Sequence, residues 1–417
     1  MNHAPVHSTT TVPEQVLADL AAFVEGHDQE FVTLRRDLHQ HPELGDAERR
    51  TTALIVDRLR AAGLHPVVLP TGTGVVCDVG PEGPRVALRA DIDALPLQDE
   101  KDVPYRSTVA GVCHACGHDV HTTALLGTGL FLAEQAAAGA LPGGVRLLFQ
   151  PAEEIIPGGA EPIASSDVLD DVTRIFAVHC DPSLPVGKVG VRVGAITSST
   201  DRVHIRLTGP GGHTSRPHMT ADLVYALGAL ITGLPAALSR RVDPRAGVAL
   251  VWGRVESGRA ANAIPDQGEL EGTLRCLDDQ AWHIAPDLVK SIVESIVAPF
   301  GVGVELNYHR GVPPVVNEAG CVRMLEAGAT QGIGSDAVVP TQQSLGGEDF
   351  AWYLDHVPGA MARLGTRAPD ADLDLDLHRG TFDVDEHAIG MGIRLLATTA
   401  FRASQPAVSV PPVPPAS

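Results

Sequence analysis

The sequence predicts an α/β protein, in which helices flank a mixed central sheet and an α+β sandwich domain is inserted. Three observations lead to this fold class. Helix and strand patterns alternate in the first part of the chain, two helices and four strands follow after about residue 190, and the first pattern resumes after Pro313-Pro314. A length of 417 residues also suits two domains better than one hydrophobic core.

The first part of the larger domain is expected at residues 1–192. Its alternating patterns predict helices at 30–39, 48–62 and 121–138, and strands at 66–69, 75–79, 85–90, 145–150 and 174–179. Residues 1–12 have the composition of a tail. We therefore expect a sheet covered by helices, which begins after this tail.

The inserted domain is expected at 193–312, and the larger domain returns at 313–417. Within the insertion, the patterns predict strands at 203–207, 248–255, 269–274 and 302–308, with helices near 220–237 and 279–298. The second part of the larger domain, 313–417, ends in a helix at 386–402, and a proline-rich tail follows after about residue 405.

Charge and composition disfavour several kinds of partner and of cellular location. The chain has 31 basic and 51 acidic residues, a formal charge of −20, which disfavours binding to nucleic acid or to an anionic membrane. No secretory signal is recognisable at the N-terminus, and no apolar run approaches the ~20 residues of a membrane-spanning helix. Six cysteines are too few for a disulfide scaffold. We therefore expect a cytoplasmic protein.

Polar residues gather where three predicted strands end. Asp91-Ile92-Asp93 directly follows the predicted strand at 85–90, Glu153-Glu154 comes two residues after the strand at 145–150, and His179 is the last residue of the strand at 174–179. Ligand sites of open α/β sheets lie outside the carboxyl ends of the strands. The sequence thus predicts one site to which all three strand ends contribute.

The segment from Cys113 to His121 precedes a predicted helix and can hold metal in two ways. Cys113 and Cys116 have the spacing of a structural zinc knuckle, but the chain offers no second closely spaced pair. Cys116 and His118 can instead form half of a catalytic metal site, in which Asp119 accepts the second N–H of a metal-bound imidazole. The nearby acids favour the catalytic interpretation.

Glu153 and Glu154 suggest a division of roles. Adjacent side chains of a turning backbone point to different sides, so one glutamate can bind a metal while the other holds a water. Considered alone, His179 and His378 can equally be core or surface residues. In the insertion, His213 can simply lie in a loop, Asn262 can lie in a turn, and Arg275 can be a charge at the edge of a sheet.

Six ordered segments resemble the M20 metallopeptidase/amidohydrolase family, in particular its aminoacylase-like branch, which includes hippurate hydrolases and auxin-conjugate hydrolases. The matching segments are Leu34–Glu43, Arg89–Pro96, His114–Asp119, Phe149–Glu154, Gly347–Phe350, and Leu377-His378 with Phe382–Glu386.

The resemblance implies a catalytic domain that holds two divalent metal ions, Zn²⁺ or Mn²⁺, with Co²⁺ or Ni²⁺ as alternatives. Glu153 would be the general base, and Asp93 and Asp119 would support the ligands. His213 would stabilise the oxyanion and contact the substrate, while Asn262 and Arg275 would hold its carboxylate. The implied metal ligands are Cys116, His118, Glu154, His179 and His378.

The implied reaction is hydrolysis of small-molecule N-acyl amino acids, by a homodimer that associates through the insertion, or by a tetramer. A dipeptidase, a carbamoyl-amide hydrolase and a non-catalytic metal- or peptide-binding protein are alternatives. Three residues depart from the family pattern and leave the substrate preference open: Ile155, Cys180 and Arg216.

Overall fold

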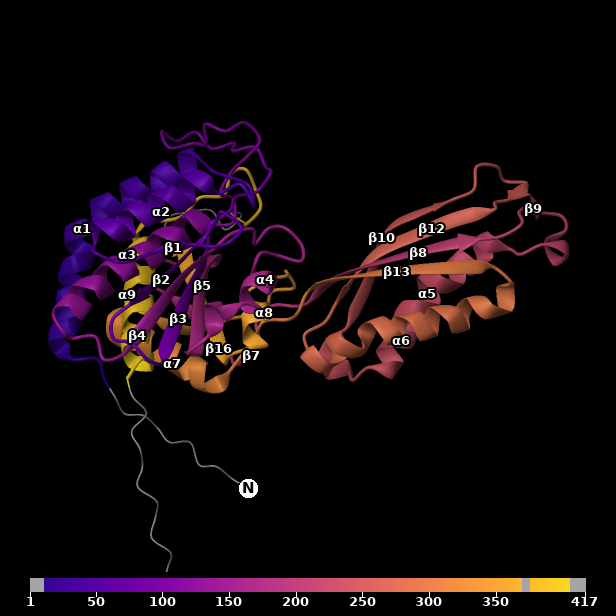
Figure 1. Ribbon diagram of the computed structural model, residues 1–417. Helices are drawn as coiled ribbons and strands as arrows, with labels where there is room; N and C mark the ends of the chain where they lie inside the picture. Colours follow the sequence, from indigo (N-terminus) through magenta and orange to yellow (C-terminus); the bar gives the residue numbers. More distant parts are fainter. Residues whose placement is uncertain (1–10, 370–375, 406–417) are drawn as a thin grey trace, which may run out of the picture.

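A mixed sheet of eight strands lies at the centre of the larger body of the protein (Figure 1). The computed structural model describes residues 11–369 and 376–405, so nearly all of both predicted tails lies outside the described residues. In spatial order, the strands are β1 (Val67–Val68), β2 (Val75–Val79), β4 (Gly144–Gln150), β3 (Arg85–Asp91), β5 (Val172–Pro185), β16 (Gly359–Arg367), β6 (Val189–Val191) and β15 (Val338–Pro340).

Strands β4, β3, β5 and β16 run parallel to one another, whereas β2 pairs antiparallel with β4, and β6 pairs antiparallel with β16. Side chains of β3 alternate between two hydrophobic clusters, with Leu88 in one and Ala87 in the other. This alternation follows from the two-residue period of a strand and buries both faces. The predicted mixed α/β fold is confirmed.

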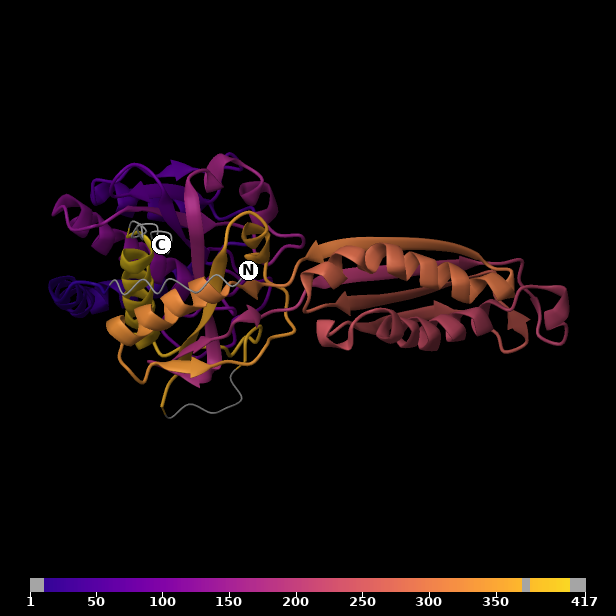
Figure 2. The same ribbon diagram turned by 90° about the horizontal axis from the view of Figure 1, so that it is seen from below.

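The helices cover the two faces unequally. The larger hydrophobic cluster joins one face to α1 (Glu14–Gln40), α2 (Arg49–Ala61), α3 (His118–Ala137), α7 (Ala319–Gly332) and α9 (His387–Ala403). The other face packs against the short helices α4 (Ala160–Ala164) and α8 (Ala351–Leu354). Figures 1 and 2 show the long helices stacked along the sheet.

Two predicted bounds differ most from the structure. Helix α1 begins at Glu14 rather than near residue 30, because Val16, Leu20 and Phe23 are buried at helical spacing. Strand β5 does not end at His179 but continues to Pro185, since it still pairs with β16 beyond that histidine.

A second, antiparallel sheet has the order β10-β12-β8-β13 and forms an arm that extends from the body (Figures 1 and 2). Its elements are β8 (Thr200–Thr208), β10 (Ala249–Ser257), β12 (Gln267–Arg275), β13 (Gly303–Val312), α5 (Leu223–Arg241) and α6 (Asp279–Val297). The helices share one hydrophobic cluster with the sheet. We keep 193–312 as the proposed bounds of the inserted domain.

Short elements complete the chain. Strands β7 (Gly194–Ala195) and β14 (Val316–Asn317) pair where the chain leaves and re-enters the body, and β9 (Gly212–His213) pairs with β11 (Ala263–Ile264) at the far end of the arm (Figure 1). Single turns of 3-10 helix span Asp167–Leu169, Pro217–Met219, Pro244–Ala246 and Ala298–Phe300.

Helix α5 is long and apolar enough to cross a membrane, judged by length and composition alone. Its leucines at 223, 227, 230, 234 and 238 are buried in the cluster of the arm. One apolar stripe at intervals of three and four residues is the pattern of a helix that packs on a sheet.

Candidate metal centre and cavity

The turn before α3 places Cys116 and His118 side by side. Gly117 precedes the helix with a positive φ of 85°, a conformation that glycine adopts without strain. A Cβ at this position would lie 2.8 Å from Cys180 Sγ. The turn therefore requires glycine, and Cys180, one of the departures from the family pattern, packs directly against it.

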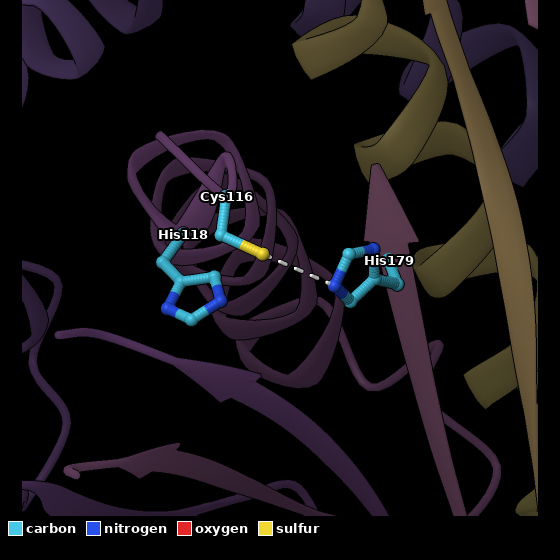
Figure 3. Close-up of side chains that lie close together, drawn as sticks. All are labelled: Cys116, His118 and His179. Atoms are coloured by element: carbon cyan, nitrogen blue, oxygen red, sulfur yellow. Dashed lines mark hydrogen bonds between the residues drawn. The ribbon is translucent and has the colours of Figure 1, made fainter. Parts of the chain in front are cut away.

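The imidazoles of His118 and His179 both direct Nε2 towards the cluster. His118 Nδ1 donates to the Asp93 carbonyl oxygen at 3.0 Å, and His179 Nδ1 donates to the Cys180 carbonyl oxygen at 2.8 Å. In the neutral form of each ring, Nε2 therefore carries the lone pair that a metal ligand needs. Cys116 Sγ lies 3.5 Å from His179 Nε2. Figure 3 marks this contact with a dashed line.

The glutamate pair follows β4, after Ala152, whose φ is 58°. Positive φ in a residue other than glycine is uncommon and costs free energy, so packing must impose it. The Glu154 backbone N–H donates to Asp93 Oδ2 at 2.9 Å. As a result, Glu154 Oε1 lies 3.8 Å and Glu153 Oε2 4.0 Å from His118 Nε2.

His378 belongs to the C-terminal part of the chain and lies beside Glu154 in the same cluster. Its backbone N–H donates to the Ala115 carbonyl oxygen at 2.8 Å, and its φ is 60°. Its Nε2 lies 3.5 Å from Glu154 Oε1. The structure thus brings the five predicted ligands and Glu153 together, with groups of their donor atoms within 4.8 Å of one another.

Burial dominates the electrostatics of this cluster. It raises the pKa of the Cys116 thiol, and it raises the pKa of Glu154 to about 7. Burial, together with Glu348 and Glu154, holds the pKa of Glu153 well above its usual range. Burial and the charge of Arg363 lower the pKa of His179, which favours its neutral, ligating form.

Two observations fit the cluster to divalent cations. The atoms His118 Nε2 and Glu154 Oε1 are buried and have no hydrogen-bond partner within the described part of the chain. Buried polar atoms are normally paired. Thiol, imidazole and carboxylate are also the donors that transition metals prefer.

A cavity of about 380 Å³ opens over the cluster. Ile156 and Val312 line it as apolar groups, and Arg275 and Arg363 line it as cations. Arg275 Nη1 donates to Thr200 Oγ1 at 3.2 Å and to the Leu345 carbonyl oxygen. This places the guanidinium of Arg275 where the arm joins the body.

His213 and Asn262 are not brought to this cavity within the single chain. His213 lies in β9 at the far end of the arm, where it is exposed and its Nδ1 accepts from the Ser215 N–H at 3.1 Å (Figure 1). The Asn262 carbonyl oxygen accepts from the Thr214 N–H, so Asn262 lies beside His213.

The expected partner of the metal-bound imidazole needs a correction. Asp119 Oδ2 accepts from Arg35 Nε and from His39 Nδ1, both at 2.7 Å, and its contacts lie away from the cluster. Asp93 is the carboxylate that contacts His118. Asp119 is the second residue of α3 and therefore faces α1 rather than the turn.

Two arginines near the site, Arg89 and Arg363, were not predicted from the sequence. Arg89 is buried, and it donates to Asp91, Asp349 and Gln150 beneath the cluster. Arg363 lines the cavity from β16. A charged residue in the middle of a buried apolar strand was the available signal for both, because such a charge needs a partner.

Comparisons with known proteins agree on one family. The family model described as peptidase family M20/M25/M40 matches residues 87–402. N-acetylcysteine deacetylase of Bacillus subtilis is 37% identical over 374 residues, which cover 89% of this chain and 96% of that protein. A putative glutamate–cysteine ligase 2-3 of Rhodococcus jostii is 49% identical over 370 residues, but the match spans only 46% of its length and 88% of this chain.

A solved structure gives the same result. A dinuclear metal-binding peptidase of the M20 family from Bacillus subtilis aligns with a TM-score of 0.78 and 35% identity, over 90% of this chain and 98% of that one. The chain therefore belongs to the M20 peptidase family, and it is a hydrolase of the metal-dependent amidohydrolase type that acts on amide bonds.

Proposed function

We propose that the protein hydrolyses the amide bond of N-acyl amino acids or related conjugates, and that each cleavage consumes one water and gives a carboxylate and a free amino acid. The observation that carries this proposal is the convergence of metal-ligand side chains and Glu153 in a cavity that Arg275 also lines. The deacetylase named among the relatives supports an acyl amino acid as substrate.

We propose that Cys116, His118, Glu154, His179 and His378 hold two divalent cations. Thiolate and imidazole suit Zn²⁺, the carboxylate also suits Mn²⁺, and Co²⁺ or Ni²⁺ are alternatives. Bound there, the cations would lower the pKa of a water and polarise the substrate carbonyl.

Glu153 is the proposed general base. Its carboxylate faces His118 across 4.0 Å and is largely buried. Its raised pKa means that it accepts a proton more readily than an exposed glutamate does. In this proposal Glu153 takes a proton from the attacking water and then transfers it to the leaving nitrogen.

Arg275 is proposed to bind the carboxylate of the amino acid part. A guanidinium has five N–H donors, and only Nη1 donates to Thr200 and Leu345. The remaining donors can form the two parallel hydrogen bonds that a carboxylate accepts.

His213 and Asn262 are proposed to act in the cavity of a partner chain, within a homodimer that associates through the inserted domain, with a tetramer as the alternative. Their position at the exposed end of the arm supports this arrangement. Mixing inactive Glu153→Gln chains with inactive His213→Ala chains should then restore part of the activity. If mixing restores none, the proposal of a shared site is wrong.

Glu153→Gln tests the function most directly. The variant should bind the same amount of metal as the wild type by elemental analysis and lose at least about 100-fold in turnover, measured as amine release from a panel of N-acyl amino acids. Glu161→Gln, in the nearby helix α4, is the matched exposed control. Near-normal hydrolysis by Glu153→Gln would exclude Glu153 as the base, and a wild type inactive on the whole panel would exclude the function.

A further inference from the structure

Arg363 stands in the middle of an otherwise apolar strand and faces the cavity. Residues Gly359 to Thr366 of β16 are all buried, and only 7% of the surface of Arg363 is exposed. In the parallel pairing of β16 with β5, Arg363 lies opposite His179. Paired residues of neighbouring strands project from the same face of a sheet. The guanidinium therefore lies on the side of the proposed metal ligands, and both residues line the cavity.

The other neighbour of β16 leaves room for this side chain. Strand β6 places Gly190 opposite Arg363, and a Cβ at position 190 would be 3.2 Å from the Arg363 Cβ and 2.8 Å from the Thr341 Cβ. A larger residue at position 190 would crowd the base of the arginine side chain. The sheet therefore accommodates a long side chain directed into the cavity.

Among the residues that the structure describes, neither a hydrogen bond nor an ion pair within 4 Å reaches the Arg363 guanidinium, and the carboxylates of Glu348 and Asp181 act on it only from a greater distance. The other two buried arginines in the described part of the chain differ sharply. Arg35 forms ion pairs with three carboxylates, and so does Arg89. A guanidinium stays charged at all ordinary pH values, and a buried charge without a partner is costly. The geometry therefore indicates that an anion from outside the chain binds beside the Arg363 guanidinium.

Arg363 also stands where two cavities meet. Together with Ser344 and Leu377, it lines both the cavity over the ligand cluster and a second cavity beside it. Asp181, Asp376 and Arg379 also line the second cavity, so acidic groups outnumber basic ones away from Arg363, and an anion is expected at the junction, beside the Arg363 guanidinium. The remaining lining there is rich in hydroxyl and amide groups: Ser183, Thr341, Gln342 and Gln343.

The first cavity thus has two guanidinium groups on different elements. Arg275 comes from the end of β12 where the arm joins the body, and Arg363 comes from the central sheet beside His179. A substrate with one carboxylate can neutralise one of them. An uncharged group placed against the other would leave a buried cation desolvated and unpaired.

We propose that Arg363 binds a second carboxylate of the substrate, so that the preferred substrates are N-acyl amino acids with two carboxylates. The second carboxylate belongs either to the amino acid side chain or to the acyl group. This inference rests on the proposed amide hydrolysis and adds the chemical class of the substrate.

Two pairs of nearly isosteric substrates test the inference with the wild-type, metal-loaded enzyme. N-acetyl-L-glutamate is compared with N-acetyl-L-glutamine, and N-succinyl-L-alanine with N-butanoyl-L-alanine. We expect at least about tenfold higher kcat/KM for the charged member of one pair, the range for a hydrogen bond to a charged group. The pair that shows the preference tells whether the carboxylate lies on the amino acid side or on the acyl side.

Arg363→Met should remove that preference. The ratio of kcat/KM between the charged and neutral substrates should fall to near one, mainly through a higher KM for the charged substrate, and Arg363→Lys should restore part of the ratio. Arg367→Met, at the partly exposed end of the same strand, is the matched control and should keep the wild-type ratio. A merely structural role of Arg363 would lower both rates and leave the ratio unchanged.

The two proposals fail in different ways. If the wild type hydrolyses the neutral substrates as well as the charged ones, the role of Arg363 is wrong and amide hydrolysis stands. If it hydrolyses no N-acyl amino acid, the proposed function itself is wrong. The wild-type comparison decides the matter even if Arg363→Met does not fold.

Discussion

Replacing His39 with glutamine should remove a pH-dependent part of the stability of the protein. His39 is fully buried in α1, with Nδ1 2.7 Å from Asp119 Oδ2 and Nε2 3.2 Å from Asp99 Oδ2. Carboxylate oxygens only accept hydrogen bonds, so both ring nitrogens must carry a proton. The structure therefore requires a buried imidazolium.

The magnitude follows from the pKa of His39. Burial lowers this pKa, but Asp119 and Asp99 raise it more, to about 10. Because the folded pKa lies above the unfolded value of about 6.5, the stabilisation is fully present below pH ~6.5 and is lost as the pH rises through ~10. The difference corresponds to at most about 5 kcal/mol. We expect about 2–4 kcal/mol, because Arg35 and Lys101 also neutralise these carboxylates.

Urea unfolding in the presence of chelator measures the effect. The difference in unfolding free energy between the wild type and His39→Gln should be largest at pH 6.5 and should shrink to below about 1 kcal/mol at pH 9.5. His41→Gln, at the exposed end of the same helix, is the control and should show no such trend. A difference that stays constant over this pH range would refute the imidazolium.

Three further predictions concern the cluster and the sheet beneath it. Cys116→Ala should lower the bound metal per chain, and unchanged stoichiometry by elemental analysis would remove this thiol from the ligand set. Asp93→Asn should weaken metal binding by about 10- to 100-fold in a chelator competition, because the Asp93 carboxylate contacts His118 Nδ1 and accepts from the Glu154 N–H; equal affinity would contradict that role. Arg89→Met should lower the unfolding free energy by about 3–5 kcal/mol, since it leaves buried carboxylates without their cation. The exposed control Arg240→Met should change it little, and equal losses in both variants would argue against a buried ion-pair network.

Much of the site could be predicted because its donors occupy short local patterns. Cys116 and His118 are separated by one glycine, and Glu153 and Glu154 are adjacent, so the chain alone brings each pair together. The position of Glu153 and Glu154 after a predicted strand, like that of Asp91 and Asp93, was enough to expect that the strand ends form one site, since parallel strands end at one edge of a sheet. The roles of His179 and His378 needed the family resemblance, because a single histidine has no pattern.

The partners of these donors could not be predicted in the same way. Asp119 is next to His118 in sequence but contacts His39 and Arg35 of α1, whereas Asp93 takes the expected place beside the imidazole. In a helix, neighbouring residues point about 100° apart, so adjacency in sequence argues against a shared contact. The choice between the two carboxylates depends on how α1 and β3 pack around α3.

The sequence by itself determined the fold class, the alternation of helices and strands, and the residue types that gather around the metal centre, because these depend on local periodicity and short motifs. Only the tertiary structure decided that His213 and Asn262 lie far from the cavity of their own chain, and that Arg363 lines the cavity without a hydrogen bond or close ion pair to any residue in the described ranges. The physical reason is that the register between distant strands and the direction of the arm follow from the packing of the whole chain, which no local pattern records.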